Sequence, residues 1–310
     1  MVDRFSPSSS RSQQMPREIA EISVALATVN RPAGARRCVD ALLRGNTLPR
    51  EIVVIDQSDN SLQLSSSDVG SVEEVRLTYR HQHRRGLSAS RNAAIELARC
   101  PIIAFTDDDC VPDRDWVRQL SLAFVERPTA AVAGSVCPLA ANAPGLVAMS
   151  LRTSPRPREL ARPTTAPWQL GTGANLAVRR AWLDRIGPYD ERLGAGSAGR
   201  AGEDIDLLFR LLRAGAVVRY EPSAIVRHAL QTRQRRMLKR GDYGWGVGGC
   251  CGIHMRRRDA LGALMLARWL GFRCRRGVAA MLRGDRQTAY EEVLILAGTA
   301  GGVAYGFRTK

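Results

Sequence analysis

The stretch Ile-Ile-Ala-Phe-Thr-Asp-Asp-Asp-Cys-Val-Pro at residues 102–112 says the most about the fold of this chain. Its apolar start is typical of a buried strand, and it ends abruptly in three aspartates, Asp107, Asp108 and Asp109. Adjacent carboxylates repel one another, so a folded protein tolerates three of them best where a cation neutralises them. Carboxylate oxygens suit Mn²⁺ or Mg²⁺, and Mg²⁺ commonly joins carboxylates to a ligand's phosphates. The stretch therefore predicts a metal–phosphate site, and a solvated acidic loop is the simpler alternative.

Apolar strands and amphipathic helices alternate on both sides of this stretch. The expected strands are Ile22–Thr28, Glu51–Ile55, Val75–Tyr79, Ile102–Phe105, Ala130–Val136 and Val217–Tyr220. The expected helices lie near Val39 and at Ser88–Ala98, Trp116–Val125 and Gly202–Arg213. Such alternation predicts an α/β fold with a doubly wound, mostly parallel sheet. In such a sheet ligands bind beyond the carboxyl ends of the strands, which is where the three aspartates fall.

Composition divides the chain into three parts. Residues 1–19 are rich in Ser, Gln and Arg and are expected to form a disordered tail. Residues 20–230 hold the strand–helix alternation, with a loop rich in Ala, Pro and Arg at residues 139–167 that is expected to be mobile. Residues 231–310 form a basic, Gly-rich region that is expected to be helical, with helices at Asp259–Leu270 and Gly277–Leu282.

Positive charge is concentrated in the C-terminal third. The whole chain has a net charge of +16, and residues 227–310 contribute 17 Lys and Arg against 5 Asp and Glu. A polyanionic partner is therefore expected there: a membrane surface, a nucleic acid or an anionic acceptor. The apolar segments at residues 261–272 and 293–307 are too short and uneven to span a bilayer, but they could lie in an anionic membrane interface. Alternatively, these helices pack on the rest of the chain or form a homodimer.

Cysteine usage and the N-terminus bear on the compartment. Seven scattered cysteines without a CxxC pair give no disulfide framework, which favours a reducing compartment. The first residues lack the apolar core of a secretion signal. The sequence therefore predicts a cytoplasmic protein that can attach peripherally to the inner leaflet of the membrane.

A second acidic cluster, Glu203-Asp204-Ile205-Asp206, opens the expected helix at Gly202–Arg213. Carboxylates at a helix N-terminus are stabilised by the helix dipole by about 0.3–1 kcal/mol each, which is the structural explanation. The functional explanation is a general base that takes a proton from an acceptor hydroxyl. One acidic cluster would then hold a metal–phosphate leaving group, and the other would activate the nucleophile. Asp206 is expected to cap or pair instead.

Five segments together resemble family 2 glycosyltransferases with the GT-A fold. They are VALATVNRP at 24–32, EIVVIDQSDN at 51–60, GLSASRNAAI at 86–95, IIAFTDDDCVP at 102–112, and GTGANLAVRR with GEDIDLLFRLLRAG at 171–180 and 202–215. Each segment is weak alone, and their order and spacing carry the resemblance. It implies a catalytic domain at 20–230, with a nucleotide-binding half at about 20–112 and an acceptor half at about 113–230.

The resemblance also implies residues that bind the donor. In the family, the loop after the first strand and the acid that ends the second hold the nucleotide, which here are Thr28, Asn30, Arg31 and Asp56. Arg91 is expected to face the nucleotide or its phosphates, and Gly173 and Asn175 to line the donor-sugar pocket. A solvated turn acid at Asp56 and a surface salt bridge at Arg91 remain as the structural alternatives.

The DxD motif of the family matches Asp107–Asp109. By analogy Asp109 binds Mn²⁺ or Mg²⁺, and Asp107 faces the ribose or sugar of the donor and contributes to the metal site, with Asp108 beside them. His228 follows a strand-like run near the place where some members have a histidine on the metal or diphosphate. A structural histidine is the alternative there.

The implied reaction moves a sugar from a nucleoside-diphosphate sugar to an acceptor hydroxyl with inversion. Asp204 matches the general base and Glu203 the supporting acid beside it. The acceptor could be lipid-linked or part of a cell-envelope glycan. Two alternatives remain: a non-catalytic nucleic-acid-binding protein that uses the basic region, and a phosphohydrolase with Asp107 as nucleophile. The basic region has no recognised motif for specific nucleic acid, and neither alternative gives Glu203 and Asp204 a role.

Overall fold

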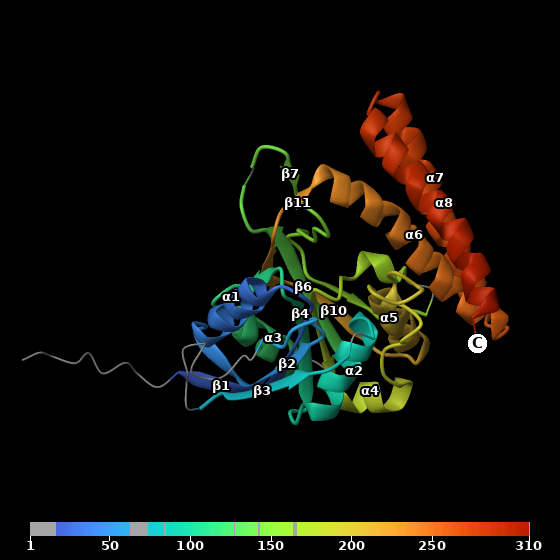
Figure 1. The fold of residues 1–310 in the computed structure, drawn as a ribbon. Helices are drawn as coiled ribbons and strands as arrows, with labels where there is room; N and C mark the ends of the chain where they lie inside the picture. Colours follow the sequence, from blue (N-terminus) through green and yellow to red (C-terminus); the bar gives the residue numbers. More distant parts are fainter. Residues whose placement is uncertain are drawn as a thin grey trace, which may run out of the picture.

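A nine-stranded mixed sheet forms the centre of the computed structural model, which describes residues 17–62, 74–83, 85–126, 128–141, 143–163 and 166–309 (Figure 1). The strand order is β3-β2-β1-β4-β9-β6-β10-β5, and β8 pairs with β10. Its strands are β1 (Glu18–Thr28), β2 (Thr47–Asp56), β3 (Arg76–His81), β4 (Ile102–Asp107), β5 (Cys110–Pro112), β6 (Ala131–Pro138), β8 (Arg158–Leu160), β9 (Asn175–Arg179) and β10 (Val218–His228). The predicted α/β class with a mostly parallel sheet is confirmed.

The parallel half of the sheet brings three strand ends to one edge. β1 runs parallel to both β2 and β4, in a register that pairs Thr28 with Asp56 and Ala27 with Asp107. The three carboxyl ends therefore lie side by side, and the three aspartates lie at the end of β4, next to the end of β1. β9 runs antiparallel between β4 and β6, so the sheet is mixed beyond its parallel half.

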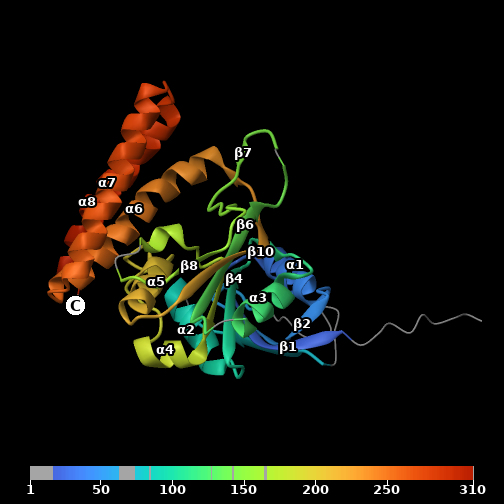
Figure 2. The same ribbon diagram turned by 180° about the vertical axis from the view of Figure 1, so that it is seen from behind.

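Helices cover both faces of the sheet (Figure 2). Apolar residues of α1 (Pro32–Leu43) and α3 (Trp116–Val125) pack on one face with Val24 and Leu26 of β1. Apolar residues of α2 (Leu87–Leu97), α4 (Arg180–Ile186) and α5 (Glu203–Arg213) pack on the other face with Ala25. Successive β1 side chains point to opposite faces, so a run of consecutive apolar residues fills both cores.

Three long helices follow the sheet: α6 (Arg233–Arg256), α7 (Ala260–Leu282) and α8 (Arg286–Arg308). α7 and α8 lie side by side and project beyond the sheet, and α6 crosses from the sheet to their base (Figures 1 and 2). A third core, which includes Trp168, Phe209 and Trp269, joins these helices to α5 and to the short 3-10 helix η1 (Pro167–Gln169). None of the described helices is long and apolar enough to cross a membrane.

Glycines let α6 and α8 approach closely. A Cβ on Gly248 would lie 2.2 Å from the carbonyl oxygen of Thr299, and one on Gly244 would lie 2.0 Å from that of Ile295. In return, a Cβ on Gly302 would lie 2.0 Å from the carbonyl oxygen of Trp245. Real Cβ atoms do not come this close, so only glycine permits the contact. The Gly-rich composition therefore holds two helices of this chain together.

The structure corrects several expected elements. The helices expected at Asp259–Leu270 and Gly277–Leu282 are one continuous helix, α7. α6 lies in the region expected to be helical, residues 231–310, but its bounds were not predicted. The loop expected at 139–167 contains β7 (Leu146–Val147), which pairs with β11 (Gln231–Thr232), as well as β8 and the start of η1. Glu18 and Ile19, expected in the tail, already belong to β1. The rest of that tail up to residue 16, and most of the polar loop after β2, lie outside the described residues.

Candidate functional site

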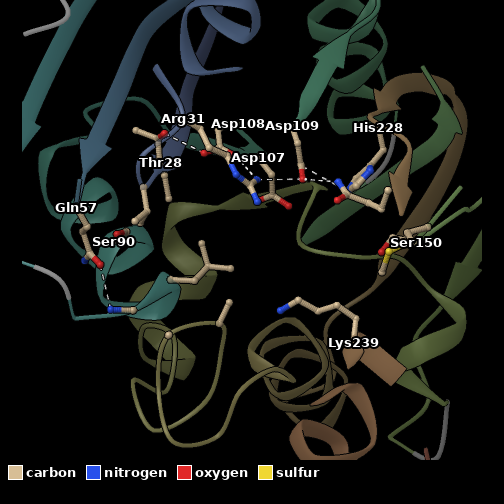
Figure 3. A pocket seen from close by; sticks show the side chains of 18 of the residues that line it. Thr28, Arg31, Gln57, Ser90, Asp107, Asp108, Asp109, Ser150, His228 and Lys239 are labelled. Atoms are coloured by element: carbon tan, nitrogen blue, oxygen red, sulfur yellow. Dashed lines mark hydrogen bonds and ion pairs between the residues drawn. The ribbon is translucent and has the colours of Figure 1, made fainter. Parts of the chain in front are cut away.

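The edge formed by the parallel strands opens into a cavity of about 470 Å³ (Figure 3). Six of the predicted site residues line it: Thr28, Arg31, Asp107, Asp108, Asp109 and His228. The segment around Ser150, the turn at Gly196 and the start of α6 close the opposite side. The cavity therefore lies between the sheet edge and the C-terminal helices.

Each of the three aspartates has a different partner. Asp107 accepts a hydrogen bond from Arg91 (Nη2–Oδ1, 3.1 Å), and Asp108 accepts from Thr28 (Oγ1–Oδ2, 2.9 Å). Arg31 Nη1 reaches both Asp108 Oδ1 (2.8 Å) and Asp109 Oδ2 (3.2 Å). Two arginines thus offset part of the charge of the three acids. Asp108 is 6% exposed and ties β4 to the loop after β1, so its visible role is structural.

Burial dominates the pKa values of two of these acids. Desolvation raises the pKa of Asp107 and of Asp108, and the neighbouring arginines, Arg91 and Arg31 respectively, lower it in part. The negative charge of Asp109 raises the pKa of both Asp107 and Asp108 further. A carboxyl group with a raised pKa gains most from an additional cation close to it.

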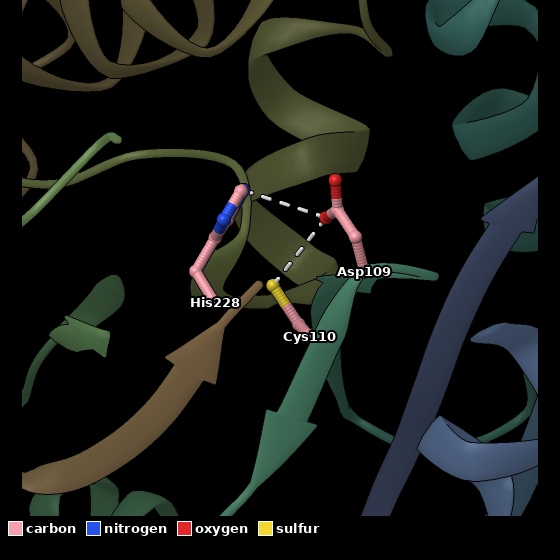
Figure 4. A group of neighbouring side chains, drawn as sticks. All are labelled: Asp109, Cys110 and His228. Atoms are coloured by element: carbon pink, nitrogen blue, oxygen red, sulfur yellow. Dashed lines mark hydrogen bonds and ion pairs between the residues drawn. The ribbon is translucent and has the colours of Figure 1, made fainter. Parts of the chain in front are cut away.

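Asp109, Cys110 and His228 form a compact cluster in which one candidate ligand atom of each lies within 4.8 Å of the others (Figure 4). His228 Nδ1 lies 2.8 Å from the carbonyl oxygen of Ala229, which assigns its hydrogen to that nitrogen. In the neutral ring Nε2 then presents a lone pair toward Asp109 Oδ1, 3.4 Å away. Two lone-pair groups that face each other fit a shared cation.

The chemistry of this cluster suits Mn²⁺ or Mg²⁺ better than a soft metal. Burial raises the pKa of Cys110 well above its usual range, so the thiol stays neutral and is a poor ligand. Within the cluster, carboxylate oxygen from Asp109 and imidazole nitrogen from His228 remain as donors. Mn²⁺ and Mg²⁺ can bind such oxygen and nitrogen ligands, and water or phosphate oxygens complete their coordination.

Arg91 connects the two acidic clusters. Its guanidinium is 4% exposed and donates to Asp107 and, through Nη1, to Glu203 Oε1 (2.9 Å). The ring of Tyr189 lies against it, with 5.3 Å between the ring centroid and Cζ. A Cβ on Gly173 would meet this guanidinium at 2.5 Å, so a larger residue there would displace Arg91 from its present position. Acids that are about 95 residues apart in the sequence therefore share one buried cation.

The start of α5 holds Glu203 and Asp204 in different environments. Glu203 is buried against Arg91, and burial together with the charge of Asp204 raises its pKa to about 7. Asp204 is half-buried; its Oδ2 accepts from Gly173 N (2.9 Å) and its Oδ1 from Ile205 N (2.8 Å). Each oxygen of Asp204 has one such bond, which leaves lone pairs that can accept a proton from a ligand.

Comparison with known proteins identifies the family. Residues 23–187 match the sequence model described as glycosyl transferase family 2. The chain belongs to this family. It is 28% identical over 225 residues to a pre-mycofactocin glycosyltransferase of Mycobacterium tuberculosis, across 71% of this chain and 45% of that protein. It is 27% identical over 205 residues to a glucosyl-dolichyl phosphate glucuronosyltransferase of Haloferax volcanii, across 62% of this chain and 63% of that protein. The chain thus spans about half the length of the first relative.

Solved structures agree on the fold. A mannosyltransferase from Pyrobaculum calidifontis, solved with GDP-Man and Mn²⁺, has a TM-score of 0.57 at 16% identity, over 93% of this chain and 90% of that one. Residues 1–349 of TarS from S. aureus give a TM-score of 0.52 at 16% identity, over 81% of this chain and 72% of that one. The predicted GT-A type of fold and the family resemblance are confirmed.

Several predicted site residues of this family 2 chain do not line the cavity. Among the described residues, the cavity lining does not include Asn30, Asp56, Arg91, Gly173, Asn175, Glu203 or Asp204. Asp56 is fully buried, and it accepts from Ser58 N (2.8 Å), Leu62 N (2.9 Å) and Tyr79 Oη (2.7 Å). These bonds outweigh burial and lower its pKa. Asp56 is therefore not the solvated turn acid of the alternative, and its contact with a nucleotide stays a prediction.

Asn175 is also fully engaged within the protein. Its Nδ2 donates to the carbonyl oxygens of Ser135 (2.7 Å) and Ala224 (2.8 Å), and its Oδ1 accepts from Trp116 Nε1 (2.8 Å). The side chain thus joins β9 to β6, β10 and α3. Asn30, with φ at 54°, pairs with Asp59 at the rim. Direct contacts of Asn175 and Asn30 with the donor stay predictions.

Sequence reasoning missed two groups of cavity residues of this glycosyltransferase. Gln57 lines the cavity, and its Oε1 accepts from the backbone of Arg85 and Gly86 at 3.0 Å each. Its place directly after Asp56 was the available signal. Gln231 and Lys239, from the start of the helical region, also line the cavity. They were missed because the basic run was interpreted only as a membrane or partner surface.

Asp206 forms ion pairs, as expected, and its partners come from α5 and α6. It is 2% exposed and accepts from Arg210 Nε (2.7 Å) and His254 Nε2 (2.8 Å), with Cys250 Sγ at 3.8 Å. Burial alone would raise the pKa of Asp206, but Arg210 and His254 lower it overall. Because Arg210 already supplies a cation, this group is an ion-pair network that fixes α6 against α5.

Proposed function

We propose that this chain is a metal-dependent inverting glycosyltransferase that moves a sugar from a nucleoside-diphosphate sugar to an acceptor hydroxyl. The observation that carries the proposal is Arg91, which holds the DxD acid Asp107 and the α5 acid Glu203 in one buried network. The leaving-group site and the acceptor-activating site are thereby joined. Family membership favours this function over a nucleic-acid-binding protein or a phosphohydrolase that uses Asp107.

In the proposed reaction, Asp204 accepts the proton of the acceptor hydroxyl while the acceptor oxygen forms a bond to the anomeric carbon. The bond from that carbon to the diphosphate oxygen breaks, and the electron pair leaves with the nucleoside diphosphate. One displacement inverts the anomeric configuration. Glu203 and Arg91 keep the start of α5 against the sheet edge and so position Asp204.

Asp109, Asp107 and His228 are the proposed ligands of the metal. When bound, Mn²⁺ or Mg²⁺ offsets the charge that develops on the departing diphosphate. Thr28, Asn30, Arg31, Asp56 and Asp108 are proposed to form the nucleotide side of the site, and Gly173 and Asn175 the sugar side. Residues 20–230 act as the catalytic domain in this proposal, since the sheet that carries the site ends at His228.

A thermal-shift screen tests the proposal. Nucleotide sugars with GDP, UDP and dTDP are added with Mn²⁺ or with EDTA, because GDP and UDP donors both occur among the structural neighbours. The donor is expected to raise the melting temperature only with Mn²⁺, since it binds the native state and not the unfolded chain. If no nucleotide sugar shifts the melting temperature with any divalent metal, the proposal is wrong.

We also propose that the tip of the α7–α8 hairpin attaches to an anionic membrane surface, which would place the protein on a cytoplasmic leaflet. The large apolar side chains at the tip are exposed: Val278, Met281, Leu282 and Tyr290, with Leu282 84% exposed. Arg283 and Arg286 stand at the same turn and can meet lipid headgroups at about 1 kcal/mol each. The homodimer alternative has less support, because the glycines behind it are used between α6 and α8.

Vesicle co-sedimentation tests this attachment. Full-length protein is expected to sediment with vesicles of phosphatidylglycerol and phosphatidylcholine at low salt, and less at high salt. The M281E/L282E variant is expected to remain in the supernatant. V125E is the control, since Val125 is 81% exposed at the end of α3. Equal sedimentation of both variants, or none of the wild type, would exclude attachment through the tip.

A further inference from the structure

A second cavity, of about 650 Å³, adjoins the first on the side of the C-terminal helices. The two share Met149, Ser150 and Lys239 as lining residues. Thr172 and Ala201 also line the second cavity. Thr172 precedes Gly173, and Ala201 precedes Gly202, the N-cap residue of α5. Asp204 accepts a hydrogen bond from Gly173 N, the residue after Thr172, and therefore lies close to this wall of the second cavity.

The second cavity is strongly basic. Arg152 and Arg158 line it from the segment before η1, and α6 and α7 add five more cations: Arg236, Lys239, Arg240, Arg273 and Arg276. Two buried glutamates serve four of these arginines: Glu291 pairs with Arg236 and Arg240, and Glu292 with Arg273 and Arg276. With Asp242, three carboxylates face seven cations, an excess of four positive charges.

Part of this basic cluster is buried, whereas Arg158, Lys239 and Arg276 are open to solvent. Desolvation lowers the pKa of Arg240 and Arg273, and the adjacent cations Arg236 and Arg276 lower it further. Arg273 is 6% exposed, and its Nε finds no hydrogen-bond partner among the described residues. The same holds for Arg152 Nε, Trp168 Nε1 and Thr172 Oγ1, whose residues also line the cavity. Buried polar groups without partners are rare in folded proteins, so the walls of this cavity contain several unsatisfied polar atoms.

The walls combine these donors with aromatic and apolar surface from Trp168, Tyr243 and Phe272. Arg273 stacks on the rings around it, with its Cζ 3.9 Å from the Trp269 centroid. Stacking fixes the plane of the guanidinium, so less freedom is lost when it binds an anion. Several arginines around one cavity match the oxygens of a phosphate or diphosphate better than a single carboxylate, because they can supply donors from several directions.

Resting on the proposed transferase function, we infer that this cavity binds the acceptor through a phosphate or diphosphate group that the acceptor carries. The helical region then has a role in acceptor recognition as well as in packing. The hydroxyl that is glycosylated would extend from the phosphate toward Asp204. An uncharged acceptor would leave the excess positive charge unmatched.

The test is a calorimetric titration with inorganic pyrophosphate in EDTA, so that no metal recruits the probe to the donor site. Wild-type protein is expected to bind, and R158Q/R276Q is expected to bind at least about tenfold more weakly. R268Q/R275Q removes the same charge from exposed positions of α7 that do not line the cavity, and is expected to bind like the wild type. Equal weakening in both variants, or no binding by the wild type, overturns the inference.

Two further measurements complete the test. One distinguishes a lipid-borne acceptor from a water-soluble one, and the other distinguishes failure of this inference from failure of the proposed function. Farnesyl diphosphate bound at least about tenfold more tightly than pyrophosphate assigns a lipid-borne acceptor, and equal affinity assigns a water-soluble phosphorylated one. The Mn²⁺-dependent thermal shift by nucleotide sugars is measured on the same samples. If that shift is present while pyrophosphate does not bind, only the acceptor inference fails. If pyrophosphate binds while no nucleotide sugar does, the proposed function fails instead.

Discussion

The carboxyl edge of the sheet and the C-terminal helices differ in charge and in what holds them together. At the sheet edge, three consecutive aspartates are held by side-chain contacts from Thr28, Arg31 and Arg91. In the helices, four arginines share two buried glutamates, and glycine contacts set the distance between α6 and α8. The acidic edge offers ligands for a cation, and the basic region offers donors for an anion. In the proposed reaction the acidic edge serves the donor with its metal, and the basic region serves the acceptor.

The difference predicts that the most severe loss of activity comes from the acidic edge. Asp109→Asn is expected to reduce transfer at least about 10³-fold, since it removes a charged ligand of the proposed metal and several kcal/mol of charge stabilisation. The Mn²⁺-dependent thermal shift by the donor is expected to disappear with it. Asp184→Asn, on the exposed side of α4, is the control. Full activity of the purified Asp109→Asn variant in metal-replete buffer would remove Asp109 from the metal site.

The next effect concerns the acid that stands between the two regions. Asp204→Asn is expected to reduce turnover by about 10²–10⁴-fold, because an amide cannot take the acceptor proton. Donor affinity is expected to be kept, since the amide oxygen of the new side chain can still accept the hydrogen bond from Gly173 N. Both are measured by steady-state kinetics and donor titration.

Glu203→Gln sharpens this test. Its main expected effect is a loss of the ion pair with Arg91, and therefore of positioning. A larger loss of turnover in Glu203→Gln than in Asp204→Asn would make Glu203 the base. A collapse of donor affinity in Asp204→Asn would make Asp204 a binding residue.

A third prediction concerns the ion-pair network that joins the regions. Asp206→Asn leaves Arg210 without its buried partner and is expected to lower the free energy of unfolding by about 3 kcal/mol at pH 7. The folded-state pKa of Asp206 is lowered, so its stabilising contribution is present above the unfolded pKa of about 3.9. That contribution is lost as the pH falls through the folded pKa. Urea denaturation from pH 7 to pH 3 should therefore show a constant difference between the variant and the wild type near neutral pH, which begins to narrow below about pH 4. Equal stability at pH 7 would refute the role of Asp206.

The smallest expected effect concerns the packing of the helices. Gly248→Ala places a Cβ 2.2 Å from the carbonyl oxygen of Thr299, and is expected to lower the free energy of unfolding by about 1–3 kcal/mol. Gly271→Ala, on α7 with nothing within 4 Å, is expected to be neutral or to stabilise by up to about 1 kcal/mol. Thermal denaturation compares them. If both substitutions act alike, close helix approach is not what the glycines provide.

The sequence by itself determined the α/β class, the edge at which the three aspartates lie and the family. These features are local: a short apolar run makes a buried strand, and polar residues directly after it fall at the strand's carboxyl end. The three aspartates could be found in this way, and the family resemblance added Thr28, Arg31 and His228; all six line the first cavity. Gln57 followed the same rule but was missed.

Only the tertiary structure decided how distant residues meet. Arg91 pairs with Glu203, Trp116 donates to Asn175, and Lys239 lines the cavity at the sheet edge. Each of these contacts joins segments that no local pattern connects. The helices show the same limit. Glycine disfavours a helix on its own, so the bounds of α6 were not predicted, whereas its close contact with α8 makes glycine the required residue. Local propensity could not predict this, because the stabilising contact comes from a helix about 50 residues further along the chain.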